Sequence, residues 1–335
     1  MLEKPSIDEG TIVSCLKQEY GLAAQDLTFL PIGADPNAAV YRAETHHGRA
    51  VFIKLRRGEV PRVSLELAAY LHAHGNVQII PPILTIHGEL CAKVGEYTLI
   101  CMPFIEAKNG YEKAMTAHQW REFGAILRHV HDATYPTRLL AELPRETYAP
   151  DWRDRLCNHL AQQTHTTHYD AHATELSQVL HDRHDQIADL IQQASARAGV
   201  LTTGLSDDYV VCHTDAHAGN VLLADDAFYL VDWDSPLLAL RERDLMFIGG
   251  GQGFIGFTPD EEWARFFSGY GDIAINTTAL QYYRFERIII DMVLYCDDLL
   301  LTTCGGANRG QALHNLKSNF ATGGTIERAY AELPV

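Results

Sequence analysis

Three features that would assign the chain to a class at once are missing from its 335 residues. No apolar run is long enough to cross a bilayer, and the best candidate, Ile288–Ile290, is followed directly by Asp291. None of the seven cysteines forms a C-x-x-C pair, which favours reduced thiols in a cytosol. Residues Met1–Pro5 lack the basic and then apolar pattern of a secretory signal. Together these absences predict a cytoplasmic globular protein.

Positive charge is also scarce. There are 27 Lys and Arg residues against 43 Asp and Glu residues, which gives a net charge of −16. This balance argues against a nucleic-acid partner and against an anionic membrane surface. Two interpretations stay open: an acidic cleft that attracts a cationic substrate, or acidity that serves solubility alone. With 47% hydrophobic and 21% charged residues, the chain has the composition of one large domain or of two lobes.

The residue patterns change character near residue 105. The first part has β-like stretches at about 27–33, 38–45 and 50–56, a helix in "VSLELAAYLHAHG" that Gly75 ends, and two or three further strands. The second part has helical patterns at about 116–132, 152–198 and 279–301, with one β insert at 209–232. Capping boxes at Ser6–Glu9, Thr116–Gln119 and Thr258–Glu261 predict three helix starts. We therefore expect an α+β fold of two lobes, 1–105 and 106–335, with a cleft between them.

The stretch "HTDAHAGNVLLADDAFYLVDWD", which begins at His213, places polar side chains around an apolar hairpin. If its turn is centred on Asp225-Asp226, then Asn220 and Asp232 lie together at the open end of the hairpin. Asp215 leads into the same place from the preceding loop. Carboxylate and amide oxygens suit Mg²⁺, which fills the rest of its coordination shell with water and substrate phosphates. The pattern therefore predicts a magnesium site at which a phosphate-bearing substrate binds.

The spacing of these residues also fits the template for phosphoryl transfer. In that template a catalytic Asp is followed five residues later by a metal-binding Asn, and then by a metal-binding Asp. Asp215 and Asn220 have this spacing, Asp232 follows, and His213 precedes the Asp as in H-R-D loops. Three turn residues without a catalytic role are the alternative interpretation.

The template requires three more parts, and each has a candidate in the first lobe. Lys54 ends the apolar strand "VFIKL", where a charge needs a reason. Its acidic partner is expected on the helix that follows, with Glu66 preferred over Glu59. The loop "IGADPN" lies between two predicted strands and can cover phosphates. Lys54 taken alone would be a surface lysine, and only the companion motif gives it a function.

Together with "GADPNA", "DWDSP", "ERDLMFIGGG" and "YYRFERI", these motifs resemble the aminoglycoside phosphotransferase family. That family shares the protein-kinase-like fold and includes choline kinases and other small-molecule kinases. The resemblance runs from about Phe29 to Leu300, and it departs from the family at Thr214, where glycine is frequent. It implies an enzyme that transfers the γ-phosphate of ATP to a hydroxyl of a small cationic acceptor. The acceptor it favours is the aminocyclitol antibiotic spectinomycin, which phosphorylation would inactivate.

The resemblance also implies roles for single residues. Asp215 is the catalytic base, Asn220 and Asp232 hold Mg²⁺, and Lys54 contacts the ATP phosphates. Adenine meets backbone groups near the lobe junction. The residues expected to meet adenine are Met102, Pro103, Phe104 and Ile105. Apart from the resemblance, two carboxylates with apolar neighbours, Glu286 and Asp291, are candidates to bind the ammonium groups of a cationic acceptor, although helix-surface charge is the favoured interpretation of each taken singly. Asp234 and His217 are expected to make hydrogen bonds within their loops.

Other functions stay open at this point. The acceptor could instead be another aminoglycoside, choline, homoserine or methylthioribose, and the chain could be an ATP-binding module without turnover. The motif "GQGFIG" at 251–256 matches a dinucleotide fingerprint, which would indicate a dehydrogenase, but no strand precedes it, and we interpret it as a loop near the acceptor. His165, His168 and His172 have helical spacing, for which a polar helix face is favoured over a metal site.

Overall fold

The chain divides into two compact units in a computed structural model. The model describes residues 3–33, 35, 37–46, 48–162, 170–203, 208–225, 227–250, 253–301 and 306–332. His165, His168, residues 251–252 of "GQGFIG" and residues 34 and 36 of the predicted phosphate loop lie outside the described residues. The first unit comprises Met1–Met115, Ala133–Leu143 and Ala218–Pro236, and the second comprises Thr116–Asp132, Pro144–His217 and Leu237–Val335.

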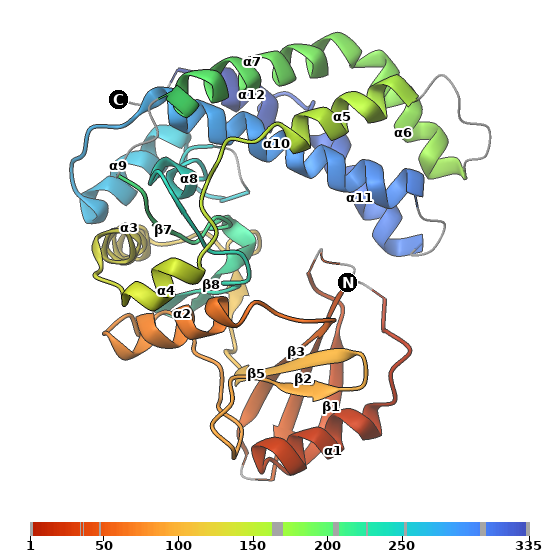
Figure 1. Cartoon of the computed structure of the whole chain (residues 1–335), viewed down its shortest axis with the longest axis vertical. Helices are drawn as coiled ribbons and strands as arrows, with labels where there is room; N and C mark the ends of the chain where they lie inside the picture. The colour runs from red at the N-terminus through yellow and green to blue at the C-terminus, as the bar shows by residue number, and fades with distance from the viewer. Residues whose placement is uncertain are drawn as a thin grey trace. The chain divides into compact units, whose positions relative to one another are not determined.

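A five-stranded antiparallel sheet with the order β1-β2-β3-β5-β4 forms the centre of the first unit. Along β3, Ile53 and Leu55 are fully buried while Lys54 between them is half-buried, so Lys54 lies on the opposite face of the sheet. Helix α1 covers the buried face, where Ile12 and Leu16 join the same core (Figure 1). The strands are β1 (Ala24–Leu30), β2 (Ala38–Thr45), β3 (Ala50–Arg57), β4 (Ala92–Val94) and β5 (Tyr97–Pro103), and the helices are α1 (Glu9–Tyr20), α2 (Arg62–Ala73) and α4 (Thr137–Glu142).

The predicted hairpin belongs to the first unit. Strands β8 (Val221–Ala224) and β9 (Ala227–Leu230) pair, and β6 (Lys108–Asn109) extends them to a three-stranded sheet. The Val231 N–H donates to the Asn220 carbonyl at 3.0 Å, which gives the predicted register at the open end. A Cβ on Gly110 would lie 2.9 Å from the Ala218 carbonyl oxygen, so the segment after β6 packs directly against the turn η1 (Ala218–Asn220). These contacts explain why the first unit takes in 218–236 and extends beyond residue 105.

Helix α10 is the central element of the second unit and contacts α5, α6, α7, α8, α11 and α12 (Figure 1). Its apolar side chains Phe285, Ile289 and Met292 are buried in the main cluster of this unit. A short antiparallel pair of strands, β7 and β10, leads into the loop that begins at His213. The elements are α3 (Ala117–Asp132), α5 (Asp151–Gln162), α6 (Ala171–Asp182), α7 (His184–Thr203), α8 (Glu242–Leu245), α9 (Pro259–Tyr270), α10 (Thr277–Leu301), α11 (Gly306–Ser318), α12 (Thr325–Tyr330), β7 (Val210–Cys212) and β10 (Leu237–Ala239).

Two of the three predicted capping boxes are present, and the third is wrong. The hydroxyl of Thr116 accepts from the Gln119 N–H at 3.1 Å, and Thr258 forms a full capping box with Glu261. The predicted box at Ser6–Glu9 is replaced by Asp8, whose carboxylate accepts from the Gly10 N–H at 3.0 Å. Asp caps a helix as well as Ser does, and Asp8 stands one residue before the first helical residue.

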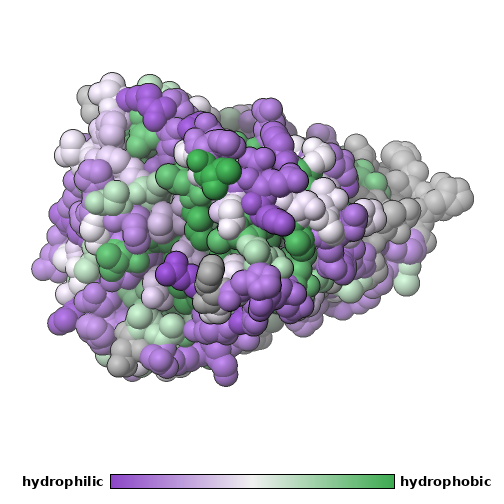
Figure 2. Space-filling model, turned by 90° about the horizontal axis from the view of Figure 1, so that it is seen from below, coloured by the Kyte–Doolittle hydropathy of each residue, from purple (hydrophilic) through white to green (hydrophobic). Residues whose placement is uncertain are grey.

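The α+β prediction is confirmed, since the sheet lies in the N-terminal part and the helices follow. On the face that Figure 2 shows, hydrophobic residues form separate patches among hydrophilic ones. Among the described residues, no helix has both the length and the apolar character needed to cross a membrane.

Candidate active site

In the first unit, Lys54 lies between two carboxylates that follow the hairpin. Its Nζ is 2.7 Å from Asp232 Oδ1 and 2.7 Å from Asp234 Oδ2, and the Lys54 side chain is 13% exposed. Arg56, two residues along the same face of β3, places Nη1 2.9 Å from Asp234. The fold therefore brings the predicted strand lysine to the predicted metal ligand Asp232, although 178 positions separate them in the chain.

The protonation states in this cluster follow from charge compensation. Burial disfavours the charge on Lys54, but Asp232 and Asp234 outweigh it and raise the pKa of the lysine above its ordinary value. Burial and the neighbouring Asp232 raise the pKa of Asp234, against the pull of Lys54 and Arg56. Asp234 was expected to make a hydrogen bond within its own loop, and it instead joins ion pairs with two residues of β3.

The oxygen atoms at the open end of the hairpin suit a cation. Asn220 is half-buried, and its carbonyl accepts from Val231, the residue before Asp232. The Asp232 side chain is 40% exposed, and its backbone has φ 67°, a left-handed conformation that Asp tolerates better than most residues. The Lys54 ammonium already donates a hydrogen bond to one carboxylate oxygen of Asp232. The donor set fits Mg²⁺, and the assignment of Asn220 and Asp232 as its ligands stays a prediction.

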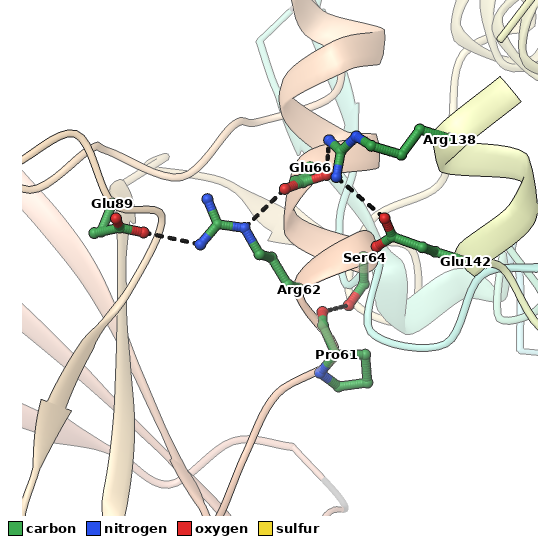
Figure 3. Close-up of polar contacts among 7 residues, drawn as sticks. All are labelled: Pro61, Arg62, Ser64, Glu66, Glu89, Arg138 and Glu142. Atoms are coloured by element: carbon green, nitrogen blue, oxygen red, sulfur yellow. Dashed lines mark hydrogen bonds and ion pairs between the residues drawn. The ribbon is translucent and has the colours of Figure 1, made fainter. Parts of the chain in front are cut away.

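Glu66 has partners other than the one expected. Its carboxylate accepts from Arg62 Nε at 2.8 Å and from Arg138 Nη2 at 2.5 Å, so the expected pair with Lys54 is not formed (Figure 3). Burial disfavours the ionised form of Glu66, but these two arginines outweigh it and lower its pKa. The two arginines also reach further carboxylates, Arg62 that of Glu89 at 2.8 Å and Arg138 that of Glu142 at 3.1 Å. A place for Glu66 in the nucleotide site stays a prediction.

The segment expected to bind adenine lies at the end of β5. Met102 and Pro103 are the last residues of β5 and pair with β3. The Phe104 N–H donates to the Ala50 carbonyl at 3.2 Å, which occupies that donor. The guanidinium of Arg42 lies over the ring of Phe104, 5.1 Å from its centroid. Contacts of these residues and of Ile105 with adenine stay predictions.

In the second unit, Asp215 is held by an arginine that the sequence patterns did not single out. Arg287 of α10 donates through Nη1 to Asp215 Oδ1, and its Nε is 3.0 Å from Asp291 Oδ1. His217 Nε2 lies 3.5 Å from the other Asp215 oxygen. Burial works against ionisation of Asp215, yet Arg287 and His217 together hold its pKa well below the ordinary range.

The loop around Asp215 is anchored by Asp244, which is fully buried. The Asp244 carboxylate accepts from the backbone N–H of His213 at 2.8 Å and from that of Thr214 at 2.6 Å. Thr214 has φ 75°, so this position takes the left-handed conformation for which glycine is suited, and it carries a β-branched residue instead. The sequence signal for Asp244 was weak, because Asp244 ends the charged run Arg241–Asp244 and only then do the apolar residues of "ERDLMFIGGG" begin.

Asp244 also belongs to a group that could hold a metal ion, with His131 and Cys212. Their ligand atoms lie within 4.8 Å of one another. His131 Nε2 is 3.1 Å from Asp244, and its Nδ1 is 2.6 Å from the Tyr270 hydroxyl. Burial raises the pKa of the Cys212 thiol well above its ordinary value. Since Asp244 and His131 already bond to protein groups, we interpret their contacts as an anchor of the loop.

The two predicted acceptor carboxylates differ in environment. Glu286 is 5% exposed, and Arg153 Nη1 lies 2.8 Å from it. Burial raises the pKa of Glu286 to about 7, although Arg153 acts in the opposite direction. A buried, already paired carboxylate is poorly placed to receive an ammonium group. Asp291 is half-buried and paired with Arg287. Acceptor binding by either residue stays a prediction.

Comparisons with known proteins agree with the resemblance in the sequence. The profile of the phosphotransferase enzyme family, APH, matches residues 26–282. The structure of spectinomycin phosphotransferase APH(9)-Ia, in complex with ADP and spectinomycin, is 33% identical and covers 98% of this chain and 99% of its own, with a TM-score of 0.89. A comparison with curated proteins finds no match.

More distant structures share the fold alone. The amicoumacin kinase hAmiN is 14% identical and covers 98% of this chain and 96% of its own, with a TM-score of 0.61. An ethanolamine kinase from Plasmodium vivax is 12% identical and covers 98% and 93%, also with a TM-score of 0.61. Motifs, fold and a family match over more than half of its length agree, and the chain is a small-molecule kinase that belongs to the phosphotransferase enzyme family.

Proposed function

We propose that this enzyme transfers the γ-phosphate of ATP to a hydroxyl group of a small cationic acceptor, and that the acceptor is spectinomycin. The observation that carries the nucleotide half is the contact of Lys54 with Asp232, which joins a strand lysine to the residue after the hairpin. Support for the acceptor comes from the similarity to a spectinomycin phosphotransferase over nearly the full length of both chains. The proposal implies a cytoplasmic enzyme, since ATP is available there, and a role in antibiotic resistance.

The first lobe, residues 1–105, would bind the nucleotide. Lys54 would contact the phosphates, and backbone groups of Met102 to Ile105 would meet adenine. Asn220 and Asp232 would hold Mg²⁺, which when bound neutralises charge on the phosphates. Since Asp232 now holds the Lys54 ammonium, nucleotide binding would redirect this lysine from Asp232 to a phosphate, and Asp234 would remain as its protein partner.

The second lobe, residues 106–335, would bring the acceptor to Asp215. As the acceptor oxygen bonds to the γ-phosphorus, the bond from that phosphorus to the bridging oxygen of ADP breaks, and the hydroxyl proton passes to the Asp215 carboxylate. The contacts with Arg287 and His217 keep this carboxylate ionised and make it a weak base. Its contribution would therefore be mainly to orient the hydroxyl, in line with catalysis by positioning and charge.

A panel assay tests the acceptor. The protein is incubated with Mg²⁺-ATP and, in separate reactions, spectinomycin, another aminoglycoside, choline, homoserine or methylthioribose, and ADP release is measured. The highest kcat/KM is expected with spectinomycin. A higher value for another compound would replace the acceptor while leaving the kinase chemistry. A melting shift with Mg²⁺-ATP but no turnover with any compound would point to a binding module.

Asp215→Asn tests the catalytic assignment. Removing a positioned acid–base group costs about 10²–10⁴-fold in rate, so we expect turnover to fall by that factor. The melting shift with Mg²⁺-ATP should be retained, because Asp215 is assigned to the acceptor side. Turnover of the variant at the parental rate would show that Asp215 is not the base.

A further inference from the structure

Arg287 has no counterpart in the phosphoryl-transfer template, and the proposed function uses only its charge. Its guanidinium donates from Nη1 to Asp215 and from Nε to Asp291, which lies one helical turn further along α10. The same guanidinium lies over the ring of Phe247, 5.7 Å from the centroid, and Phe247 is fully buried. Two carboxylates and an aromatic face therefore fix the plane of the guanidinium.

The geometry suits arginine in particular. A guanidinium presents several donors in a rigid plane, so it can bind two carboxylates at once while its orientation is maintained. Asp291 and Phe247 belong to segments other than the loop of Asp215. Because they hold Arg287 in place, the contact of Arg287 with Asp215 restricts the position of that loop. Asp244 holds the backbone of that loop at His213 and Thr214. Arg287 fixes the side chain of Asp215 in the same way.

We propose that Arg287 is a positioning residue that holds the Asp215 carboxylate in the orientation from which it accepts the hydrogen of the acceptor hydroxyl. The inference rests on the proposed role of Asp215 as the base. Asp291 then acts on Asp215 indirectly, because its ion pair orients the guanidinium of Arg287. Phosphoryl transfer depends mainly on alignment, so a loss of this hold should lower kcat while the affinity for nucleotide is kept.

The charges around Asp215 in the second unit give the inference a second readout. Arg287 and Asp291 face it from α10, and His217 faces it from its own loop. Asp215 must be ionised to accept a proton, so activity is lost as the pH falls through its pKa. Without Arg287, burial would be offset by His217 alone among these groups, and the pKa of Asp215 would rise. The acid limb that Asp215 causes lies below the pH range of the assay in the parent, and it should then move up toward that range.

The experiment compares Arg287→Met and Arg287→Lys with the control Arg284→Met. Arg284 lies three residues earlier on α10 and is buried, whereas 20% of the Arg287 side chain is exposed. Arg284 donates to the carbonyls of Met246 and Ile248 rather than to a carboxylate. For each variant we would measure kcat and KM for spectinomycin and ATP between pH 4.5 and pH 9, and the melting shift with Mg²⁺-ATP.

For Arg287→Met we expect kcat to fall about 10- to 100-fold, the scale of a small misplacement of a reacting group, with an acid limb at higher pH and an unchanged KM for ATP. Arg287→Lys should keep the parental acid limb and recover part of kcat, because lysine restores the positive charge but not the planar guanidinium that binds two carboxylates. Arg284→Met should lower the melting temperature without moving the acid limb. If Arg287→Met fails to fold, the reduced kcat of Arg287→Lys decides the question.

Two results would overturn the inference while the proposed function stands. One is a parental kcat and pH profile in Arg287→Met, or in Arg287→Lys where the Met variant is unfolded, while Asp215→Asn is inactive. The other is an equal loss of kcat in Arg287→Met and Arg284→Met with no shift of the acid limb, which would indicate a structural role. Full activity of Asp215→Asn would instead remove the proposed function, and the inference with it.

Discussion

Each unit of the molecule contributes to the candidate active site a cation that lies between two carboxylates, and the two clusters are built for different tasks. In the first unit Lys54 lies between Asp232 and Asp234, and in the second Arg287 lies between Asp215 and Asp291. Lysine is a compact charge on a flexible stem, whereas arginine is a planar fork. The first cluster is therefore suited to exchange of partners, and the second to a fixed geometry.

The neighbours of each cation support this distinction. Asp232 is the more exposed partner of Lys54, with 40% of its side chain accessible, and it is also the predicted ligand of Mg²⁺. A metal ion and a phosphate can therefore replace the Lys54–Asp232 pair at low cost. Arg287 is backed by the ring of Phe247 and by an i,i+4 partner on its own helix. Its displacement would remove the counter-ion that the half-buried carboxylates of Asp215 and Asp291 share.

Within the first cluster, the largest effect is expected from Lys54→Met. Removal of one preorganised donor from a developing anion costs about 10²–10³-fold, and we expect kcat/KM for ATP to fall by that factor. Lys54→Arg should restore little of the kcat/KM for ATP, because a cation that exchanges partners should be a compact ammonium rather than a planar guanidinium. Steady-state kinetics with varied ATP measure both variants. Full rescue by Lys54→Arg would contradict the distinction between the two clusters.

The matched control is Arg56→Met. Arg56 lies on the same face of β3 and shares Asp234 with Lys54, but it has no contact with Asp232. We expect a change in kcat/KM for ATP several-fold smaller than that of Lys54→Met. An equal loss in both variants would mean that the total positive charge, rather than the position of Lys54, determines nucleotide use.

The first cluster could be predicted from the sequence in its main parts. Lys54 in an apolar strand and the hairpin register of Asn220 both follow from periodicity and turn chemistry, which act over a few residues. The partners of Asp234 could not be predicted in this way. Which strand face meets which hairpin end depends on packing between segments about 180 positions apart, and local patterns carry no information on that.

The second cluster was the harder case. Asp291 was assigned to the acceptor, and helical spacing puts residue 287 on the same face of the helix as Asp291. An i,i+4 arginine and carboxylate are typical of an exposed helix surface, so the pattern gave no reason to link Arg287 to the loop of Asp215. Glu66 shows the same limit, since four positions separate it from Arg62, but Arg138 comes from a distant helix.

A buried carboxylate without a paired cation sharpens the comparison. Among the described residues no cation lies within ion-pair distance of Glu262, which accepts from the Gly249 N–H at 3.0 Å. Burial raises its pKa from 4.5 to about 7. The folded protein thus keeps a proton that the unfolded chain has lost, and stability falls as the pH rises between these values, by at most about 3 kcal/mol. Glu262→Gln should remove this loss, as urea unfolding at pH 5 and pH 8 would show.

Glu261→Gln is the control for this prediction. Glu261 is the neighbouring residue, and its pKa is lowered by hydrogen bonds from the backbone and hydroxyl of Thr258. Its charged form is therefore favoured in the folded state, and the substitution should give no gain in stability at pH 8. If Glu262→Gln is less stable than the parent at pH 8, a cation must stabilise the ionised form of Glu262, as Arg287 stabilises that of Asp215.

The smallest effect concerns Arg138, which holds Glu66 in the first unit. Exposed ion pairs contribute little to stability, and the Arg138 side chain is 63% exposed, so Arg138→Met should leave the urea midpoint of unfolding nearly unchanged. If the first unit exchanges partners on nucleotide binding, release of Glu66 should favour its pairing with Lys54 and lower the apparent Kd for Mg²⁺-ATP about threefold. Titration calorimetry without an acceptor measures this constant.

Glu142→Gln separates the two partners of Arg138. It removes the carboxylate 3.1 Å from Arg138 but keeps the contact of Arg138 with Glu66, so it should leave the Kd unchanged. Weaker nucleotide binding in Arg138→Met would mean that Glu66 acts from its present place between the two arginines. The first cluster would then be as fixed as that of Arg287, and Lys54 would have to reach the phosphates without a partner from α2.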